Sequence, residues 1–236
     1  MIEETQGIVI KATKYSETSL VVHIYTRDFG MQGFLVQGVY RKKSTFKPSH
    51  FQHLNRLQMV IYYKPQRQLQ KIKELKITPI FHSVPYEIEE TAIAMFMAEI
   101  LEKTLRVEEV NEPLFQFLHS SIRFLDEWEG KLTNFPLLFL IHLSRYLGFY
   151  LHNNYSEQIP YFNLQDGPFQ ANSPDPSITI PAVESNYFSQ LISQDAPDGD
   201  TLKIPHASRI ALLEKLVDYF RLHLQNFSRI RSAQVL

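Results

Sequence analysis

Gly7-Ile8-Val9-Ile10-Lys11-Ala12-Thr13 and Ser19-Leu20-Val21-Val22-His23-Ile24-Tyr25-Thr26 are two runs dense in β-branched and aromatic residues, joined by a turn-like Lys14-Tyr15-Ser16-Glu17-Thr18. Three further apolar runs follow, at residues 33–39, 57–63 and 69–78. This pattern predicts five short strands and no long helix. Because unpaired strand edges invite aggregation, we expect the strands to curl and close. The small five-stranded barrel of this kind is the OB-fold, a platform for single-stranded nucleic acids.

The rest of the chain shows apolar residues at helical spacing. Helices are predicted from Val84-Pro85 to Leu105, from Pro113 toward Trp128, from an Asn134 N-cap toward Gly148, and from Pro205 to Leu224. Residues 151–202 hold six of the 13 prolines, so we expect an irregular, loop-rich insertion there. The predicted organisation is an OB-fold nucleic-acid-binding domain at 1–80, followed by an all-α helical domain at 81–236.

The charge is unevenly distributed along the chain. Residues 1–80 carry 13 lysines and arginines against 5 acidic residues, a net charge of +8. Residues 81–236 carry 11 against 20, a net of −9, so that the whole chain has a formal charge of −1. A basic first part joined to an acidic second part suggests a polyanion as partner for the first alone.

Residue types that carry catalysis or bind metals are scarce. The chain has no cysteine, which excludes disulfides, thiolate nucleophiles and cysteine-ligated metals. His50 and His53 have a spacing seen in metal sites but no acidic ligand nearby, and 195–200 is an incomplete calcium loop. No nucleotide-binding or nucleophile motif occurs, and no nucleophile–base pair supports a hydrolase or transferase. We therefore predict no enzyme activity, no cofactor and no metal.

The most informative cluster is Tyr40-Arg41-Lys42-Lys43-Ser44-Thr45-Phe46-Lys47, with four cations, two aromatic rings and no acid. Cations neutralise phosphates, and aromatic faces stack on unpaired bases, so this mixture favours single-stranded nucleic acid. A solubilising loop at the barrel rim is the alternative interpretation. Tyr62 and Tyr63 cannot both stack on bases, because neighbours on a strand face opposite ways. Supporting cations are expected from Lys11, Lys14, Arg27, Arg56, Lys64, Arg67, Lys71 and Lys73.

Several of these segments together resemble the RecO family of bacterial DNA-repair recombination mediators. The resemblance is carried by the opening strands at 7–11 and 14–22, by Tyr25-Thr26-Arg27-Asp28-Phe29-Gly30 and by the basic segment Gly38-Val39-Tyr40-Arg41-Lys42-Lys43-Ser44-Thr45-Phe46. It is good over residues 1–80. It is looser over the helical part, where Leu147-Gly148-Phe149 and residues 162–169 match.

The resemblance implies an N-terminal OB domain, a helical domain, and binding of single- and double-stranded DNA. Family members anneal complementary strands covered by single-strand binding protein, and they act with RecR to help load RecA. Many carry a four-cysteine zinc module after the helix that ends near Gly148. This sequence has none of those cysteines, so the resemblance implies no zinc here, and we expect a shortened hairpin at 155–177.

Two assignments remain open at this stage. Arg106, Arg123 and Arg145 could receive an acidic tail such as that of single-strand binding protein, although ordinary surface pairing is the simpler interpretation. An RNA-binding translation or processing factor on the same barrel is the alternative function, because the residues do not separate RNA from DNA. The acidic start and the lack of an apolar run of about 20 residues favour a cytoplasmic, nucleoid-associated protein without a membrane span.

Overall fold

The computed structural model describes residues 1–78, 81–105, 109–173, 175–194 and 202–236. These divide into two compact units, Met1–Glu127 and Trp128–Leu236. The first unit contains a barrel and two helices, and the second contains three helices and a small sheet. The predicted domain boundary at residue 80 stays a prediction.

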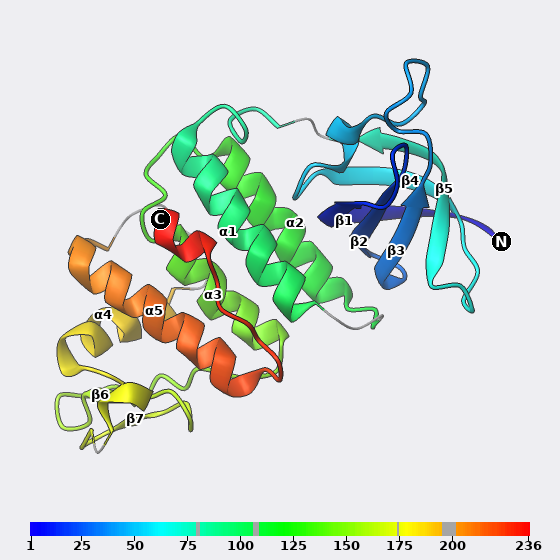
Figure 1. The fold of residues 1–236 in the computed structure, drawn as a ribbon. Coiled ribbons are helices and arrows are strands. Elements are labelled where there is room, and N and C mark those ends of the chain that lie inside the picture. Colours follow the sequence, from blue (N-terminus) through cyan, green and yellow to red (C-terminus); the bar gives the residue numbers. More distant parts are fainter. Residues whose placement is uncertain (79–80, 106–108, 174, 195–201) are drawn as a thin grey trace. The chain divides into compact units, whose positions relative to one another are not determined.

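Five strands form the closed barrel in the order β1-β2-β3-β5-β4, which confirms the predicted fold class (Figure 1). All neighbours are antiparallel except β3 and β5, which run parallel where Gly33 pairs with Leu69. Alternate residues of the β-rich runs point inward and form one core that includes Val22, Phe34 and Met59. The strands are β1 (Ile2–Lys14), β2 (Leu20–Thr26), β3 (Gly30–Val36), β4 (Arg56–Tyr62) and β5 (Leu69–Ile77).

Barrel closure depends on β1, which pairs with β4 through its first half and with β2 through its second half. Gly7 lies where the two pairings meet. A Cβ atom at this position would lie 2.5 Å from Cγ2 of Ile24 and 2.7 Å from Cε of Met59. A side chain there would collide with the core, so glycine is required at the point where β1 changes partner.

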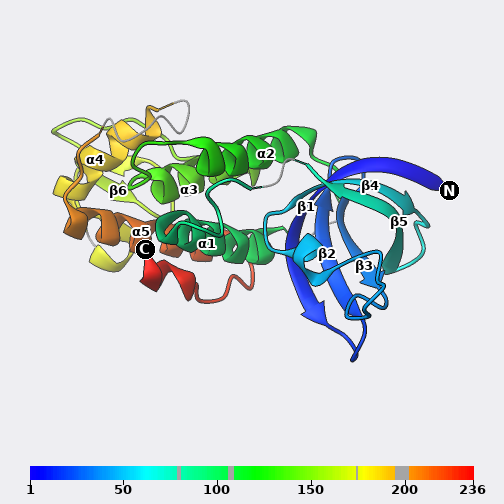
Figure 2. The same cartoon turned by 90° about the horizontal axis from the view of Figure 1, so that it is seen from above.

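Helices α1 (Ile88–Thr104) and α2 (Glu112–Glu127) complete the first unit and lie side by side (Figures 1 and 2). The predicted start at Val84-Pro85 is wrong: Glu87 is the N-cap of α1, and Glu89 and Glu90 occupy its first turn, where the helix dipole favours carboxylates. The apolar side of α2 buries residues at positions that recur every three or four, such as Leu114, Leu118, Ile122 and Leu125.

The second unit packs α3 against α4 and α5. Helix α3 is buried from Phe135 through Ser144, as expected for a helix that is apolar on all sides. The stretch at 151–202 holds more regular structure than its prolines suggest, namely one helix and a sheet in the order β7-β6-β8. The elements are α3 (Phe135–Tyr146), β6 (Tyr161–Asn163), β7 (Phe169–Gln170), β8 (Thr179–Ile180), α4 (Ala182–Ile192) and α5 (His206–His223).

Three short 3₁₀ helices accompany these elements: η1 (Pro48–Phe51), η2 (Pro176–Ile178) and η3 (Ser232–Val235). The expected hairpin at 155–177 is present as β6 and β7, in which Tyr161 pairs with Gln170. Over the described ranges, no helix has the length and apolar character needed to cross a bilayer.

Candidate nucleic-acid interface

The loop between β3 and η1 carries the basic cluster and is fixed to the barrel at both ends. Near its start, Val39 is buried in the barrel core, and its N–H donates to the Thr18 carbonyl at 2.9 Å. Near its end, Phe46 packs on the same core and meets Phe51 edge to face, with ring centroids 6.5 Å apart. Phe46, predicted as a base-stacking residue, is therefore an anchor of the loop.

Between these anchors the loop is built from tight turns. Gly38 has a φ of +72°, in the left-handed region that suits glycine. The N–H of Arg41 donates to the Gly38 carbonyl at 3.0 Å, and the N–H of Ser44 donates to the Arg41 carbonyl at 3.1 Å. The Ser44 hydroxyl then donates to the Phe46 carbonyl at 2.7 Å. These contacts use only backbone groups and the Ser44 hydroxyl, so they do not depend on the side chains of Arg41, Lys42 or Lys43.

The four cations of this loop project into solvent. Arg41, Lys42, Lys43 and Lys47 are exposed, and none forms an ion pair within the described part of the chain. Lys47 Nζ donates to the Lys42 carbonyl at 3.4 Å, which holds its charge close to the others. A group of like charges without carboxylate partners attracts phosphates and exchanges its counterions on binding.

Two further residues join this group from the same end of the barrel. The Tyr40 ring is 49% exposed, and Lys14 Nζ lies 6.0 Å from its centroid. The exposed ring offers a face to an unpaired base, and the lysine offers a charge beside it. We call the set the loop cluster and define it as Lys14, Tyr40, Arg41, Lys42, Lys43 and Lys47.

A second group of predicted cations lies at the opposite end of the barrel (Figure 1). Lys64 and Arg67 stand in the turn between β4 and β5, and Lys71 follows on β5 opposite Tyr62. The buried Gln70 side chain holds this turn through the backbone of Lys64 and Arg67, with three contacts of 2.9 Å. All three cations are exposed, but the fold separates them from the loop cluster. The nearby Lys73 pairs with Glu74 at 3.3 Å.

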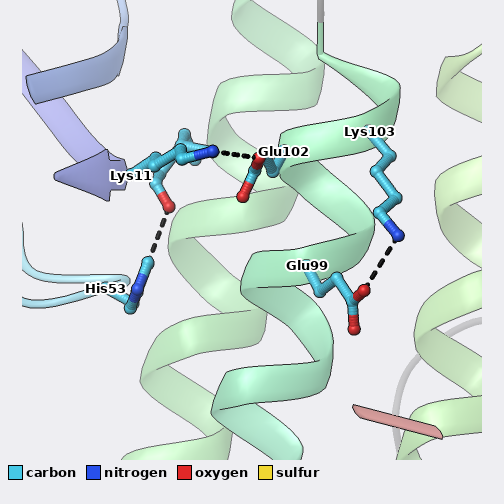
Figure 3. A network of polar contacts seen from close by, with 6 residues as sticks. Lys11, His53, Glu99, Glu102 and Lys103 are labelled. Carbon is cyan, nitrogen blue, oxygen red and sulfur yellow. Dashed lines mark hydrogen bonds and ion pairs between the residues drawn. The ribbon is translucent and has the colours of Figure 1, made fainter. Parts of the chain in front are cut away.

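Two other predicted cations bind carboxylates of the helices in the first unit. Lys11 Nζ lies 2.6 Å from a carboxylate oxygen of Glu102 on α1 (Figure 3). Arg27 pairs with Glu112 of α2, and its Nε donates at 3.0 Å. These pairs join the barrel to the helices. We therefore leave Lys11 and Arg27 out of the candidate DNA surface.

Arg56 cannot reach a ligand in this structure, because its side chain is only 2% exposed. Its guanidinium nitrogens have no hydrogen-bond partner among the described residues, and the group lies over the Phe81 ring at 5.9 Å. Burial lowers the pKa of Arg56, while the negative charges of Asp126 and then Glu127 act in the opposite direction. The sequence predicts Arg56 as a DNA-binding cation at the surface. This prediction is wrong, because the side chain at the start of β4 is buried.

Asp126 at the end of α2 holds the segment that leaves the barrel. Its Oδ1 accepts the backbone N–H groups of His82 at 2.9 Å, Ser83 at 3.0 Å and Val84 at 3.3 Å. Ser83 Oγ also donates to the Asp126 carbonyl at 2.9 Å. We call this arrangement the Asp126 clamp. Nothing in the sequence around Asp126 signals it, because the partners lie more than 40 residues apart.

The remaining sequence candidates have ordinary structural roles. Tyr63 stacks on Phe29 with ring centroids 4.2 Å apart, and the neighbouring Tyr62 is exposed, as the alternation of strand faces predicts. His50 accepts the N–H of Lys47 through Nδ1 at 3.3 Å, and its pKa is lowered by burial and then by the Lys47 charge. His53 Nδ1 contacts the Ile10 carbonyl at 2.8 Å.

Among the described residues, no group of three or more histidine, aspartate or glutamate side chains could hold a metal ion. The candidate calcium loop at 195–200 lies outside the described residues, as does Arg106. Arg123 pairs with Glu127 at 3.8 Å, and Arg145 donates to the Ile192 carbonyl at 3.0 Å. The two arginines that can be placed therefore already have ordinary partners.

Both parts of the chain match models of a known protein family. Residues 1–81 match the family model described as "Recombination protein O N terminal", and residues 85–232 match "Recombination protein O C terminal". The chain belongs to the RecO family. This identification covers both the barrel and the helical part.

Relatives named DNA repair protein RecO match the chain over its whole length. The protein of Christiangramia forsetii is 37% identical over 240 residues, covering 100% of this chain and 98% of that one. The protein of Phocaeicola vulgatus is 34% identical over 236 residues, with the same coverage. A third, from Bacteroides fragilis, is 35% identical over 237 residues, also with this coverage.

Proposed function

We propose that this RecO-family protein is a recombination mediator that binds single- and double-stranded DNA, anneals complementary strands and helps RecR load RecA. The observation that carries the proposal is the loop cluster, in which exposed cations without carboxylate partners among the described residues accompany an exposed aromatic ring. The relatives that match the whole chain are named DNA repair proteins, which supports DNA as the polyanion.

The physical task of annealing is to bring together two strands whose phosphates repel each other. A cationic surface that binds one strand lowers this repulsion and raises the local concentration of the other. This mechanism requires no covalent step, so we propose no catalytic residue. A protein with this function would work on DNA, so we propose that it is located at the nucleoid in the cytoplasm.

Single strands suit the loop cluster because their bases are free to stack. Stacking on a ring such as that of Tyr40 contributes roughly 1–3 kcal/mol per base. A double helix would use the same cations through its phosphates but could not use the ring. We therefore expect single strands to bind more tightly than duplexes, and Tyr40→Ala to reduce this difference.

The proposed function is tested by annealing of complementary strands that are precoated with single-strand binding protein, without nucleotide. We expect the full-length chain to accelerate annealing. Substitution of Arg41, Lys42 and Lys43 by alanine should slow the reaction. No acceleration by the wild-type chain would refute the annealing role. The alternative function, an RNA-binding translation or processing factor, is tested by competing bound labelled DNA with unlabelled RNA of the same sequence. Competition by RNA as strong as that by unlabelled DNA would favour the RNA-binding factor.

Protein partners are proposed for the acidic helical part. RecR and the acidic tail of single-strand binding protein are the partners that family membership suggests. Arg123 and Arg145 are the described candidates for tail contact. If Arg123→Glu together with Arg145→Glu leaves the affinity for a tail peptide unchanged, these two residues are excluded.

A further inference from the structure

A pocket of about 390 Å³ in the second unit collects positive charge at one point. Its volume lies within the range of small-ligand sites. Two segments far apart in sequence form its walls: one precedes α3, and the other leads into α5. The lining residues are Lys131, Thr133, Asn134, Leu202, Lys203, Ile204 and Arg209.

Hydrogen bonds hold the two walls in place. Asn134 Nδ2 donates to the Leu202 carbonyl at 2.7 Å, which ties one segment to the other. Arg209 Nη1 donates to the Ile204 carbonyl at 2.9 Å, which fixes its guanidinium beside the second wall. Arg209 Nη2 also contacts His206 Nδ1 at 3.4 Å. A guanidinium has five N–H donors, so these two contacts use only part of them.

Three cations line the pocket within the part of the chain that the structure describes. Among these described residues, Lys131, Lys203 and Arg209 form no ion pair, and the described lining contains no acid. The pocket also borders the N-termini of α3 and α5, where each helix dipole contributes about half a positive charge. The described lining of this pocket therefore carries three positive charges and no negative one.

We propose that this pocket binds a phosphomonoester group. Such a group carries about −1.5 to −2 charges near pH 7, which suits a pocket lined by three cations. A phosphodiester backbone carries one charge per phosphate and is usually followed by cations spread along a groove. The phosphate could be free, or it could be the terminal phosphate of a DNA strand. The second source rests on the proposed function, whereas phosphate binding itself does not.

The absence of cysteine makes a direct occupancy test possible. Leu202→Cys in the full-length chain places a single thiol in the pocket wall, and Gln190→Cys on α4 serves as the control thiol. Alkylation by iodoacetamide, a neutral reagent, is timed with inorganic phosphate, with a 5′-phosphorylated oligonucleotide and with its 5′-hydroxyl counterpart. At about ten times the dissociation constant, a bound group should slow alkylation of the pocket thiol about tenfold.

We expect protection by phosphate and by the phosphorylated oligonucleotide, weaker protection by the hydroxyl form, and none at the control thiol. The double variant Lys131→Gln, Lys203→Gln should raise the dissociation constant for inorganic phosphate at least tenfold. The double variant Lys215→Gln, Arg221→Gln removes the same charge elsewhere in this unit and should leave that dissociation constant unchanged. Melting temperatures of both double variants confirm that they are folded.

Equal protection by the two oligonucleotides would overturn the monoester assignment, because the terminal phosphate would then contribute nothing. Lack of protection by every probe would overturn the site itself. Because oligonucleotide binding to the loop cluster is measured separately by anisotropy, failure of the pocket can be distinguished from failure of the proposed DNA binding.

Discussion

Replacing Arg41, Lys42 and Lys43 together by alanine should weaken single-strand binding and make it less sensitive to salt. None of the three side chains forms an ion pair with a residue that the structure describes, and the loop keeps its Val39 and Phe46 anchors. The change therefore removes charge and leaves the loop conformation in place. Three lost phosphate contacts should flatten the slope of log K against log salt by about 2.

That slope change has a measurable consequence. When the salt concentration rises fourfold, the wild-type affinity should fall about 20-fold more than the affinity of the triple variant. Fluorescence anisotropy of a labelled oligothymidine, titrated at several salt concentrations, measures both slopes. The matched control replaces Lys64, Arg67 and Lys71 by alanine at the other end of the barrel, with the same loss of charge.

The outcome separates the two ends of the barrel. An unchanged slope in the first variant would exclude the loop cluster as the DNA surface. An equal fall in both variants would mean that only total charge matters and that the position of the cations does not.

Three further predictions concern the first unit. Arg56→Met should leave the free energy of unfolding unchanged or raise it, because an apolar side chain replaces a buried charge that has no hydrogen bond among the described residues. Asp126→Ala should lower the free energy of unfolding by about 3 kcal/mol or more. Urea unfolding measures both variants, and a large loss of stability in Arg56→Met would contradict this reasoning. Burial, then Arg56, then Arg123 lower the pKa of His119. Below about pH 6.5 the unfolded chain therefore takes up the proton before the folded chain does, and stability falls. In His119→Gln the melting temperature should depend less on pH below about 6.5, and an unaltered pH dependence would contradict this role of His119. Lys11→Gln should cost less than about 1 kcal/mol and leave DNA affinity unaltered; a reduced salt slope in anisotropy would return Lys11 to the DNA surface.

The barrel could be predicted from the sequence because its signals are local. Runs of β-branched residues and the turns between them define each strand, and five short strands leave few ways to close a sheet. The helices were predictable for the same reason, except at their ends: a proline at position 85 suggested a first turn that begins at Ile88 instead. Helix α4 was missed because the prolines around it concealed a short apolar pattern.

The site was harder to predict, because exposure depends on contacts between distant residues. Lys11 and Glu102 are 91 residues apart, and Arg27 and Glu112 are 85 apart, so no local pattern indicates that these cations are paired. The assumption that a charged side chain is exposed failed for Arg56. The phosphate pocket was not anticipated, because its walls come from segments about 70 residues apart.

Helix α2, which carries Phe115 and Asp126, determines where this polypeptide can be shortened. A truncation after residue 80 would remove the carboxylate that attracts Arg56 and uncover Tyr25, whose ring packs beside Phe115 at 6.3 Å. Such a fragment would expose apolar surface and a buried guanidinium at once. The shortest version expected to remain soluble therefore extends to Glu127, and isotope-labelled samples for spectroscopy should be designed with that end point.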